Sequence, residues 1–266
     1  MSIQTIKNGD LEYQVAEGIA VPHCFTTRYG GVSTGSQSSL NLAYGRGDSM
    51  ENVEKNLRIL TGAMGADPEK LVLTRQTHSD IVRVVTDADC NGFFHRDYPE
   101  CDGLVTNTPG VTLMVFTADC TPLLFHDPVT GAVGAAHAGW RGTAQNIGAK
   151  TVEAMVKHFG CDPGNIRAAI GPNLAQCHFE TDLDVPAAMI AAYGEDIRTF
   201  IRQKGEKYYP DLKGINAFAL RQAGVRQIEI SDACTWCESD RFWSHRVTKG
   251  DRGSQGAVIT CREVEA

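Results

Sequence analysis

The sequence predicts a single-domain protein with a mixed α/β sandwich fold. Short apolar runs rich in β-branched residues are interleaved with segments of helical periodicity along the 266 residues. The composition is that of an ordinary globular protein, with 42% hydrophobic and 21% charged residues. No internal repeat, low-complexity tract or linker-like change of composition divides the chain. We therefore expect residues 1–266 to form one domain.

The N-terminal part predicts a strand, a loop and a helix. A strand is expected around Leu11–Val15, followed by a loop from Phe25 to Leu42 in which glycine and hydroxyl residues are frequent. The backbone of such a loop can approach a ligand closely. Asp48 and Glu51 resemble a capping box, and the helix that follows ends at Gly65. Its apolar face is predicted to contain Val53, Leu57, Leu60 and Met64.

The middle of the chain predicts strands that lead to a hairpin. Strands are expected at Leu71–Leu73, Ile81–Val85, Cys101–Thr106 and Val111–Phe116, with a polar loop over residues 87–100. The hairpin consists of Pro122–Phe125, a turn with Asp-Pro and Thr-Gly, and Ala132–Ala136. It would bring Cys120 and His137 to neighbouring positions at the end of a sheet.

The C-terminal part predicts helices and strands in alternation. Thr143 is expected to cap a helix that reaches Phe159 and is stopped by Gly160. The remaining elements are expected at Ile166–Ile170 (strand), Pro186–Tyr193 (helix), Asn216–Ala223 (helix), Ile228–Ile230 (strand) and Ala257–Thr260 (strand).

Charge and composition exclude several functional classes. A net charge of −7 argues against a general nucleic-acid-binding protein, which presents a basic face. The N-terminus lacks a signal-peptide pattern, and no apolar run approaches membrane-spanning length. The nine cysteines are scattered, so we expect mostly free thiols in a reducing compartment. These features predict a cytoplasmic protein with small-molecule partners and no membrane association, and they leave the oligomeric state unknown.

Three side chains at strand ends form a candidate metal site. His78, Cys120 and His137 each follow or flank an apolar run. One thiolate and two imidazoles suit a zinc ion that keeps its fourth position open. In a second interpretation, Cys120 and His137 are the nucleophile and base of a hydrolase or amidase. A dyad requires no second histidine, so His78 favours the metal site.

Charged neighbours extend this candidate site. Asp119 and Asp102 are carboxylates that could orient an imidazole or accept a proton. Arg141, in the sequence His-Ala-Gly-Trp-Arg-Gly, would add positive charge for an anionic substrate group.

The pair Cys234 and Cys237 is a weaker signal for metal. A structural zinc ribbon requires a second Cys-x-x-Cys motif, which is absent, so we expect this region to have a packing role. Cys177 and Glu180 either line the site or pack beneath it.

Several motifs in a fixed order carry a family resemblance. They are Phe-Thr-Thr-Arg (25–28) with Gly-Gly-Val-Ser (30–33), Gln-Thr-His (76–78), Ala-Asp-Cys (118–120), His-Ala-Gly-Trp-Arg-Gly (137–142), Gly-Pro (171–172) with Cys-His-Phe-Glu (177–180), and Phe-Trp-Ser-His-Arg (242–246). From about Val21 to Arg246 the chain resembles the laccase-domain family of purine nucleoside phosphorylases, also labelled polyphenol oxidase or peptidoglycan-editing factor. Val247 departs from the pattern, because a basic residue is expected there.

The resemblance implies a fold, a cofactor and activities. It implies an α/β sandwich related to Cys-His toxin hydrolases and a zinc ion held by His78, Cys120 and His137. The implied activities are phosphorolysis of adenosine, inosine, guanosine and methylthioadenosine, and deamination of adenosine. Copper is less favoured, because multicopper oxidases need many clustered histidines and this chain has eight histidines in all.

Roles for individual residues follow from that reaction. Arg28 and Arg141 are expected to grip phosphate, since guanidinium groups suit planar recognition of phosphate oxygens. Asn41 and Gln76 could read the base or the ribose hydroxyls. Asp119 is the candidate for proton transfer, beside Cys120 and His137.

Three other functions remain open from the sequence. They are a cytoplasmic amidase that edits peptidoglycan precursors, a polyphenol oxidase, and a purine-sensing or division-associated binding protein without turnover.

Overall fold

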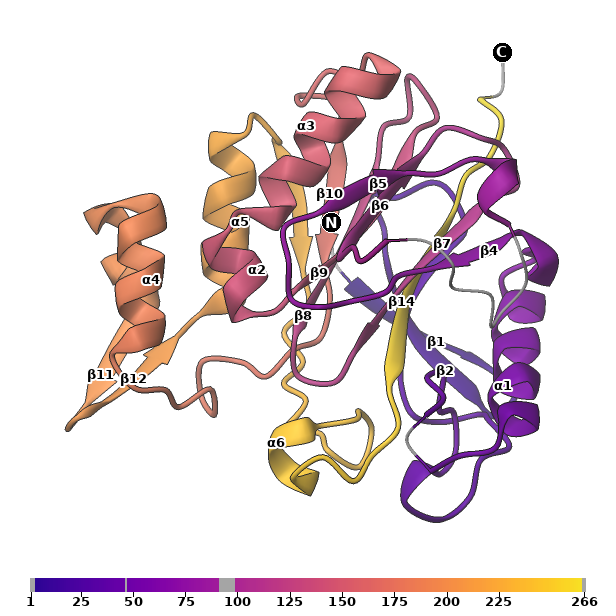
Figure 1. The fold of residues 1–266 in the computed structure, drawn as a ribbon, viewed down its shortest axis with the longest axis horizontal. Coiled ribbons are helices and arrows are strands. Elements are labelled where there is room, and N and C mark those ends of the chain that lie inside the picture. The colour runs from indigo at the N-terminus through magenta and orange to yellow at the C-terminus, as the bar shows by residue number, and fades with distance from the viewer. Residues whose placement is uncertain (1–2, 46, 91–98, 265–266) are drawn as a thin grey trace.

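Two six-stranded β-sheets, packed face to face, form the centre of the computed structural model, which describes residues 3–45, 47–90 and 99–264 (Figure 1). The first sheet has the order β1 (Ile3–Asn8), β2 (Leu11–Ala16), β3 (His23–Thr26), β14 (Gln255–Thr260), β7 (Thr112–Thr117), β4 (Leu71–Leu73). The second has the order β13 (Gln227–Ile230), β10 (Arg167–Ile170), β8 (Thr121–His126), β9 (Val133–Ala138), β6 (Gly103–Thr106), β5 (Val82–Val84). Both sheets mix parallel and antiparallel pairs, so the predicted mixed α/β class is confirmed.

The core between the sheets is made by alternate residues of the strands. In β7, Leu113 and Val115 face the second sheet, while Met114 between them packs in a separate cluster on the other side. Leu124 and Ala135 of the second sheet meet them, and all are fully buried. Because both faces of β7 are covered, its sequence is an uninterrupted apolar run rather than an alternation of apolar and polar residues.

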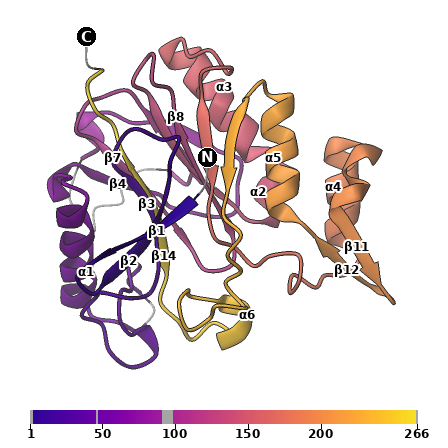
Figure 2. The same cartoon turned by 180° about the vertical axis from the view of Figure 1, so that it is seen from behind.

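Helices cover the outer faces of both sheets. Helix α1 (Met50–Ala63) lies against the first sheet, whereas α3 (Ile147–Phe159) and α5 (Leu212–Gln222) lie against the second (Figures 1 and 2). The predicted apolar face of α1 is confirmed, since Val53, Leu57 and Leu60 are buried. The layers are therefore helix, sheet, sheet, helix.

Two helix starts differ from the prediction. Helix α1 is capped by Ser49, whose Oγ accepts from the backbone N–H of Asn52, and not by Asp48. The predicted helix from Thr143 is two helices, α2 (Trp140–Ala144) and α3, and Thr143 lies inside α2. Asn146 separates them with a left-handed backbone (φ 63°), which no continuous helix can contain.

A smaller unit projects from one end of the sandwich. It consists of α4 (Asp184–Tyr193) and the hairpin of β11 (Ile201–Lys204) and β12 (Lys207–Pro210) (Figures 1 and 2). Met189 of α4 and Ile197, in the turn that joins α4 to β11, pack with Ile215 of α5. The sequence did not predict the hairpin, because its residues are mostly polar.

The remaining described elements are short. They are the helix α6 (His245–Thr248) and 3₁₀ turns at Gly35–Gln37, Pro68–Lys70, Asp87–Asp89 and Glu195–Phe200. Residues 91–98 of the predicted loop over 87–100 lie outside the described residues.

Two chain crossings between the sheets create the candidate site. The chain leaves the first sheet after Leu73 and enters the second at Val82, and it crosses again between Thr117 and Thr121. His78 lies in the first crossing and Cys120 in the second. The predicted hairpin is formed by β8 and β9, and its register pairs Pro122 with His137, which places His137 close to the segment that contains Cys120.

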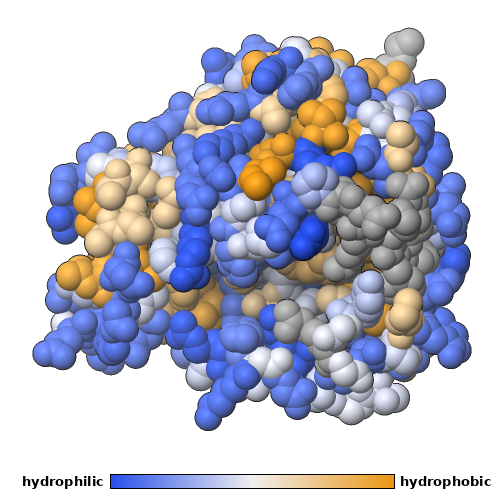
Figure 3. Space-filling model, viewed as in Figure 1, coloured by the Kyte–Doolittle hydropathy of each residue, from blue (hydrophilic) through white to orange (hydrophobic). Residues whose placement is uncertain are grey.

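No helix among the described residues is long and apolar enough to cross a membrane. The face of the molecule seen in Figure 3 is mostly hydrophilic, with smaller apolar patches.

Replacing Leu124 with alanine should lower the free energy of unfolding by about 2–5 kcal/mol, because it leaves a cavity between the two sheets. Val129→Ala, at a side chain that is 64% exposed in the hairpin turn, should change it by less than about 0.5 kcal/mol. Urea unfolding of both variants measures the difference, and similar midpoints would contradict the assigned core.

Candidate metal centre

The ligating atoms of His78, Cys120 and His137 lie within 4.8 Å of one another. Cys120 Sγ is 3.9 Å from Nε2 of His78, and the two imidazole rings meet edge to face with centroids 4.9 Å apart. His137 is buried, Cys120 is half-buried and His78 is exposed. The three side chains therefore converge as predicted, and the group is open to solvent on the side of His78.

A single buried carboxylate orients the two histidines. Oδ1 of Asp102 accepts from Nδ1 of His137 at 2.7 Å and from the backbone N–H of His78 at 3.1 Å. Its Oδ2 accepts from the backbone of Thr77 and from both the backbone and the hydroxyl of Ser79. Because Nδ1 of His137 is occupied by Asp102, Nε2 of that ring is the nitrogen left to face a cation.

The shape of the site fits a metal ion. Gly139 faces the cluster, and a Cβ at that position would lie 2.7 Å from His78 Cδ2 and 3.2 Å from Cys120 Sγ. Any other residue there would push the ligands apart. His78 itself has a left-handed backbone (φ 63°), which the bonds to Asp102 hold in place. One sulfur and two nitrogens with an exposed side match a centre that retains an open position.

The electrostatics of the cluster favour a thiolate. Burial opposes ionisation of Cys120, but the charge and hydrogen bonds of His137 and His78 lower the pKa of its thiol to about 6. Burial alone would lower the pKa of His137. The Cys120 sulfur and the Asp102 carboxylate outweigh the effect of burial and raise the pKa of this imidazole to about 9. Hydrogen bonds from His137 and Ser79 hold the pKa of Asp102 at about 2 in spite of its burial. A metal cation bound by Cys120 and His137 would replace a proton there. The negative charges of the Cys120 thiolate and of Asp102 would attract it.

A cavity of about 220 Å³ opens beside the three ligands. Its lining comes from both sheets and from the loops that connect them: Ala43, Tyr44, Thr74, Gln76, His78, Phe116, Thr117, Ala118, Cys120, His137, Arg252, Ser254. Three of these residues, Tyr44, Arg252 and Ser254, were not predicted from the sequence. The only local signal for Arg252 is its place in a glycine-containing turn, Gly-Asp-Arg-Gly, before the last strand.

The two amide candidates are both held by the backbone. Gln76 lines the cavity, but its Oε1 accepts from the backbone N–H of Phe116 and its Nε2 donates to the carbonyl of the same residue. Asn41 is fully buried, outside the lining set, and its Oδ1 accepts from the backbone of Ala43 and Ser254. Asn41 thereby fixes two residues of the cavity wall.

The other predicted site residues lie outside the cavity lining. The guanidinium of Arg28 stacks 3.9 Å from the ring centroid of Trp243 and donates to the carbonyls of Ser38 and Ser239. Arg141 is exposed and lies over the ring of Trp140 at 4.3 Å.

Asp119, just before Cys120, has a left-handed backbone (φ 88°). Its carboxylate oxygens accept from the Thr235 hydroxyl and from the backbone N–H of Arg246, each at 2.6 Å. Of the two carboxylates that the sequence offered for orienting an imidazole, Asp102 occupies that position.

The fold and the site together define an α/β sandwich protein with a candidate mononuclear metal centre. The chain belongs to the family described as multi-copper polyphenol oxidoreductase laccase, whose model matches residues 22–262. The family resemblance predicted from the motifs is thus confirmed.

Individual relatives match almost the whole chain. A protein of Deinococcus radiodurans named purine nucleoside phosphorylase is 41% identical over 244 residues, which cover 92% of this chain and 90% of the relative. Purine nucleoside phosphorylase YlmD of Bacillus subtilis is 35% identical over 90% of this chain and 88% of its own length. The crystal structure of a hypothetical protein YfiH of Bacillus licheniformis superposes with a TM-score of 0.91 at 33% identity, covering 98% of this chain and 99% of that one.

Asp102→Asn should weaken metal binding at this candidate centre, probed with zinc, by about 10–100-fold, because the amide cannot accept from all the donors that now orient His78 and His137. Competition of the purified protein with a chromophoric chelator measures this affinity. Asp127→Asn is the control, since that buried carboxylate lies in the turn at the far end of β8. Equal zinc affinity in the wild type and Asp102→Asn would contradict the orienting role.

Proposed function

We propose that this protein is a zinc-dependent purine nucleoside phosphorylase of the cytoplasm. Its substrates would be inorganic phosphate with adenosine, inosine, guanosine or methylthioadenosine, and it would also deaminate adenosine. The observation that carries the proposal is the convergence of His78, Cys120 and His137 on a cavity in a chain whose relatives are named purine nucleoside phosphorylases. Free cysteines throughout the described residues support a reducing compartment. A relationship of the fold to Cys-His toxin hydrolases belongs to the same proposal.

Zinc is proposed over copper on the basis of the ligand set. A blue-copper centre also uses two histidines and one cysteine, but adds a weak axial ligand that is commonly methionine. No methionine is among the described residues that line the cavity. Aerobic oxidation of a phenol by the copper-loaded protein, without phosphorolysis by the zinc-loaded protein, would overturn this choice in favour of a polyphenol oxidase.

The proposed reaction exchanges one bond at the sugar. A phosphate oxygen bonds to C1′ of the ribose, the C1′–N9 bond breaks, and the purine leaves with the bonding electron pair and takes up a proton. The sugar carries positive charge at the transition state, as in glycoside cleavage. A zinc ion held by the three ligands would supply Lewis acidity toward phosphate in phosphorolysis and toward water in deamination.

The protein must hold an anion next to this centre. Arg252 lines the cavity and is only 8% exposed, and its Nη1 is positioned by the carbonyl of Gly253 and the hydroxyl of Ser254. We therefore add Arg252 to Arg28 and Arg141 as a proposed phosphate-binding residue and rank it first of the three. Burial strengthens such a charge-assisted contact, because little water competes for the anion.

Polar neighbours complete the proposed site. Gln76 is placed to meet the nucleoside, and Asn41 supports the wall that carries Ser254. For Asp119 we propose positioning of Cys120, since both of its oxygens already accept hydrogen bonds.

The lowered pKa of Cys120 specifically favours a second candidate, a thiol amidase acting on peptidoglycan precursors. In that reaction the Cys120 thiolate would attack an amide carbonyl, and His137 would protonate the leaving amine. His78 has no required part in such a dyad.

His78→Ala should therefore abolish phosphorolysis, reducing hypoxanthine release from inosine and phosphate by more than about 100-fold, because it removes a metal ligand. His158→Ala, at an exposed histidine on α3, should leave the rate unchanged. Loss of amide hydrolysis in Cys120→Ala, with full activity in His78→Ala and in chelator, would favour the thiol amidase and contradict the metal enzyme.

Arg252→Ala should raise the KM for phosphate by about 10–100-fold, with a much smaller effect on the KM for inosine, because a hydrogen bond to a charged group is worth about 1.5–3 kcal/mol. Arg28→Ala and Arg141→Ala test the positions predicted from the sequence, and exposed Arg198→Ala is the control. Steady-state kinetics with each substrate varied in turn separates the effects. A larger phosphate effect in Arg28→Ala than in Arg252→Ala would reverse the ranking.

A further inference from the structure

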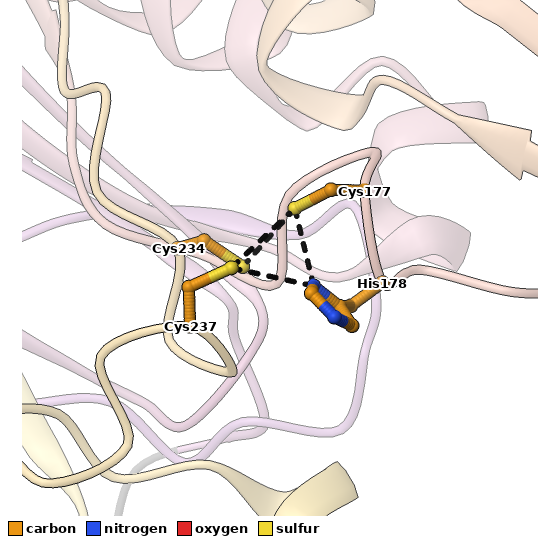
Figure 4. Close-up of side chains that lie close together, drawn as sticks. All are labelled: Cys177, His178, Cys234 and Cys237. Carbon is orange, nitrogen blue, oxygen red and sulfur yellow. Dashed lines mark hydrogen bonds between the residues drawn. The ribbon is translucent and has the colours of Figure 1, made fainter.

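A second cluster of metal-ligating side chains lies outside the cavity, on two loops that follow neighbouring strands. Cys177 and His178 come after β10, and Cys234 and Cys237 come after β13 (Figure 4). These strands are parallel neighbours, so their carboxyl ends meet at the same edge of the second sheet. Beyond the strand ends, an isolated parallel bridge between Asn173 and Cys234 keeps the loops together.

The distances in this cluster are those of a tetrahedral metal site. Sγ of Cys177 is 3.6 Å from Sγ of Cys234 and 3.8 Å from Sγ of Cys237. Nδ1 of His178 is 3.2 Å from the sulfur of Cys177 and 3.4 Å from that of Cys237 (Figure 4). Zinc–sulfur bonds of about 2.3 Å and zinc–nitrogen bonds of about 2.0 Å imply S···S separations of about 3.8 Å and S···N separations of about 3.5 Å in a tetrahedron.

Neither a disulfide nor the packing role predicted from the sequence requires four ligating atoms to face one another. The sulfur separations of Cys177 are far longer than a disulfide bond of about 2.05 Å. The ring of His178 stacks on Trp236 at 5.1 Å with an interplanar angle of 13°. Its Nδ1 points toward the sulfurs (Figure 4). All four ligating atoms lie within 4.8 Å of one another.

The charge around the cluster is also suited to a thiolate-rich site. Three thiolates, one neutral imidazole and a zinc ion leave a net charge of about −1. Lys213 is only 6% exposed, and its ammonium group donates to the carbonyls of Ser231 and Ala233, directly before Cys234. The ammonium group already interacts with the carboxylates of Asp211 and Asp232, and the thiolates of Cys234 and Cys177 would add to that negative charge.

We propose that Cys177, His178, Cys234 and Cys237 bind a second zinc ion in a closed, structural site. Four protein ligands leave no position for a reactant, so the ion would serve the fold and not the chemistry. This inference does not depend on the proposed phosphorylase activity.

The second ion would support the first centre through one loop. Thr235 lies between two of the proposed ligands, and its hydroxyl donates to Asp119, the neighbour of Cys120. Its backbone N–H donates to Asn173, and the backbone of Leu174 donates to the carbonyl of Asp119. Asp119 is thus held by hydrogen bonds from two loops, residues 233–238 and residues 173–178. The proposed ion would link these two loops to each other.

Metal analysis of the purified full chain, by mass spectrometry of the metal after gel filtration, tests the proposal. The wild type should contain two zinc ions per chain. Cys237→Ser and His178→Ala should each contain one zinc ion, the one at the first centre. His78→Ala should also contain one, the ion of the second site. The double variant His78→Ala with Cys237→Ser should contain none. Cys90→Ser, at a thiol outside both clusters, should keep two. The single zinc retained by His78→Ala separates failure of this proposal from failure of the proposed function.

The wild type loaded with cobalt provides a test that survives misfolding of the variants. Two centres with four thiolates in total should give about four times the thiolate-to-cobalt absorption expected from the single thiolate of the first centre, and only one quarter of it should appear if the second centre binds no metal. Two zinc ions per chain in Cys237→Ser, or one zinc in the wild type that His78→Ala removes, would overturn the proposal. A Cys234–Cys237 disulfide in the freshly purified wild type, detected as a mass lower by two hydrogens, would also overturn the proposal.

Discussion

The buried carboxylate of Asp102 is the contact on which the candidate centre depends. It has no exposure to solvent, and five donors from the crossing that contains His78 and from His137 satisfy it. A buried carboxylate without hydrogen-bond donors would cost several kcal/mol. The crossing that contains His78, the β6 strand and the β9 strand must therefore meet in one arrangement. The same bonds fix the backbone of one ligand and the tautomer of another. Asp102 therefore couples the packing of the two sheets to the geometry of the candidate ligands.

Backbone strain is concentrated where the chain passes between the two sheets. His78 and Asp119 are two of the four described non-glycine residues with positive φ, and each lies in one of the crossings. A left-handed backbone costs of order 1–3 kcal/mol and persists only where surrounding contacts determine it. Asp102 supplies those contacts for the first crossing, and the loop of Thr235 supplies them for the second. Two of the candidate ligands, His78 and Cys120, are therefore held in place by these contacts, although neither lies in a strand or helix.

Local patterns in the sequence predicted the features that depend on local forces. The apolar face of α1, the strands of the central hairpin and the three ligands of the candidate centre follow from periodicity, turn residues and ligand chemistry. Features set by distant pairing could not be found that way. The stacking of Arg28 on Trp243 joins segments 215 residues apart, and the second cluster needs the pairing of β10 with β13. Asn146 interrupts a helix for which every neighbouring residue is suitable.

The place of β14 in the first sheet has a consequence for biosynthesis. This strand lies between β3 and β7, so a segment near the end of the described chain occupies the middle of its sheet. Until the ribosome has released residues 255–260, β3 and β7 each expose an open edge that invites intermolecular pairing. Native topology is reached only after translation has passed that strand, and a nascent chain must be shielded from aggregation until then.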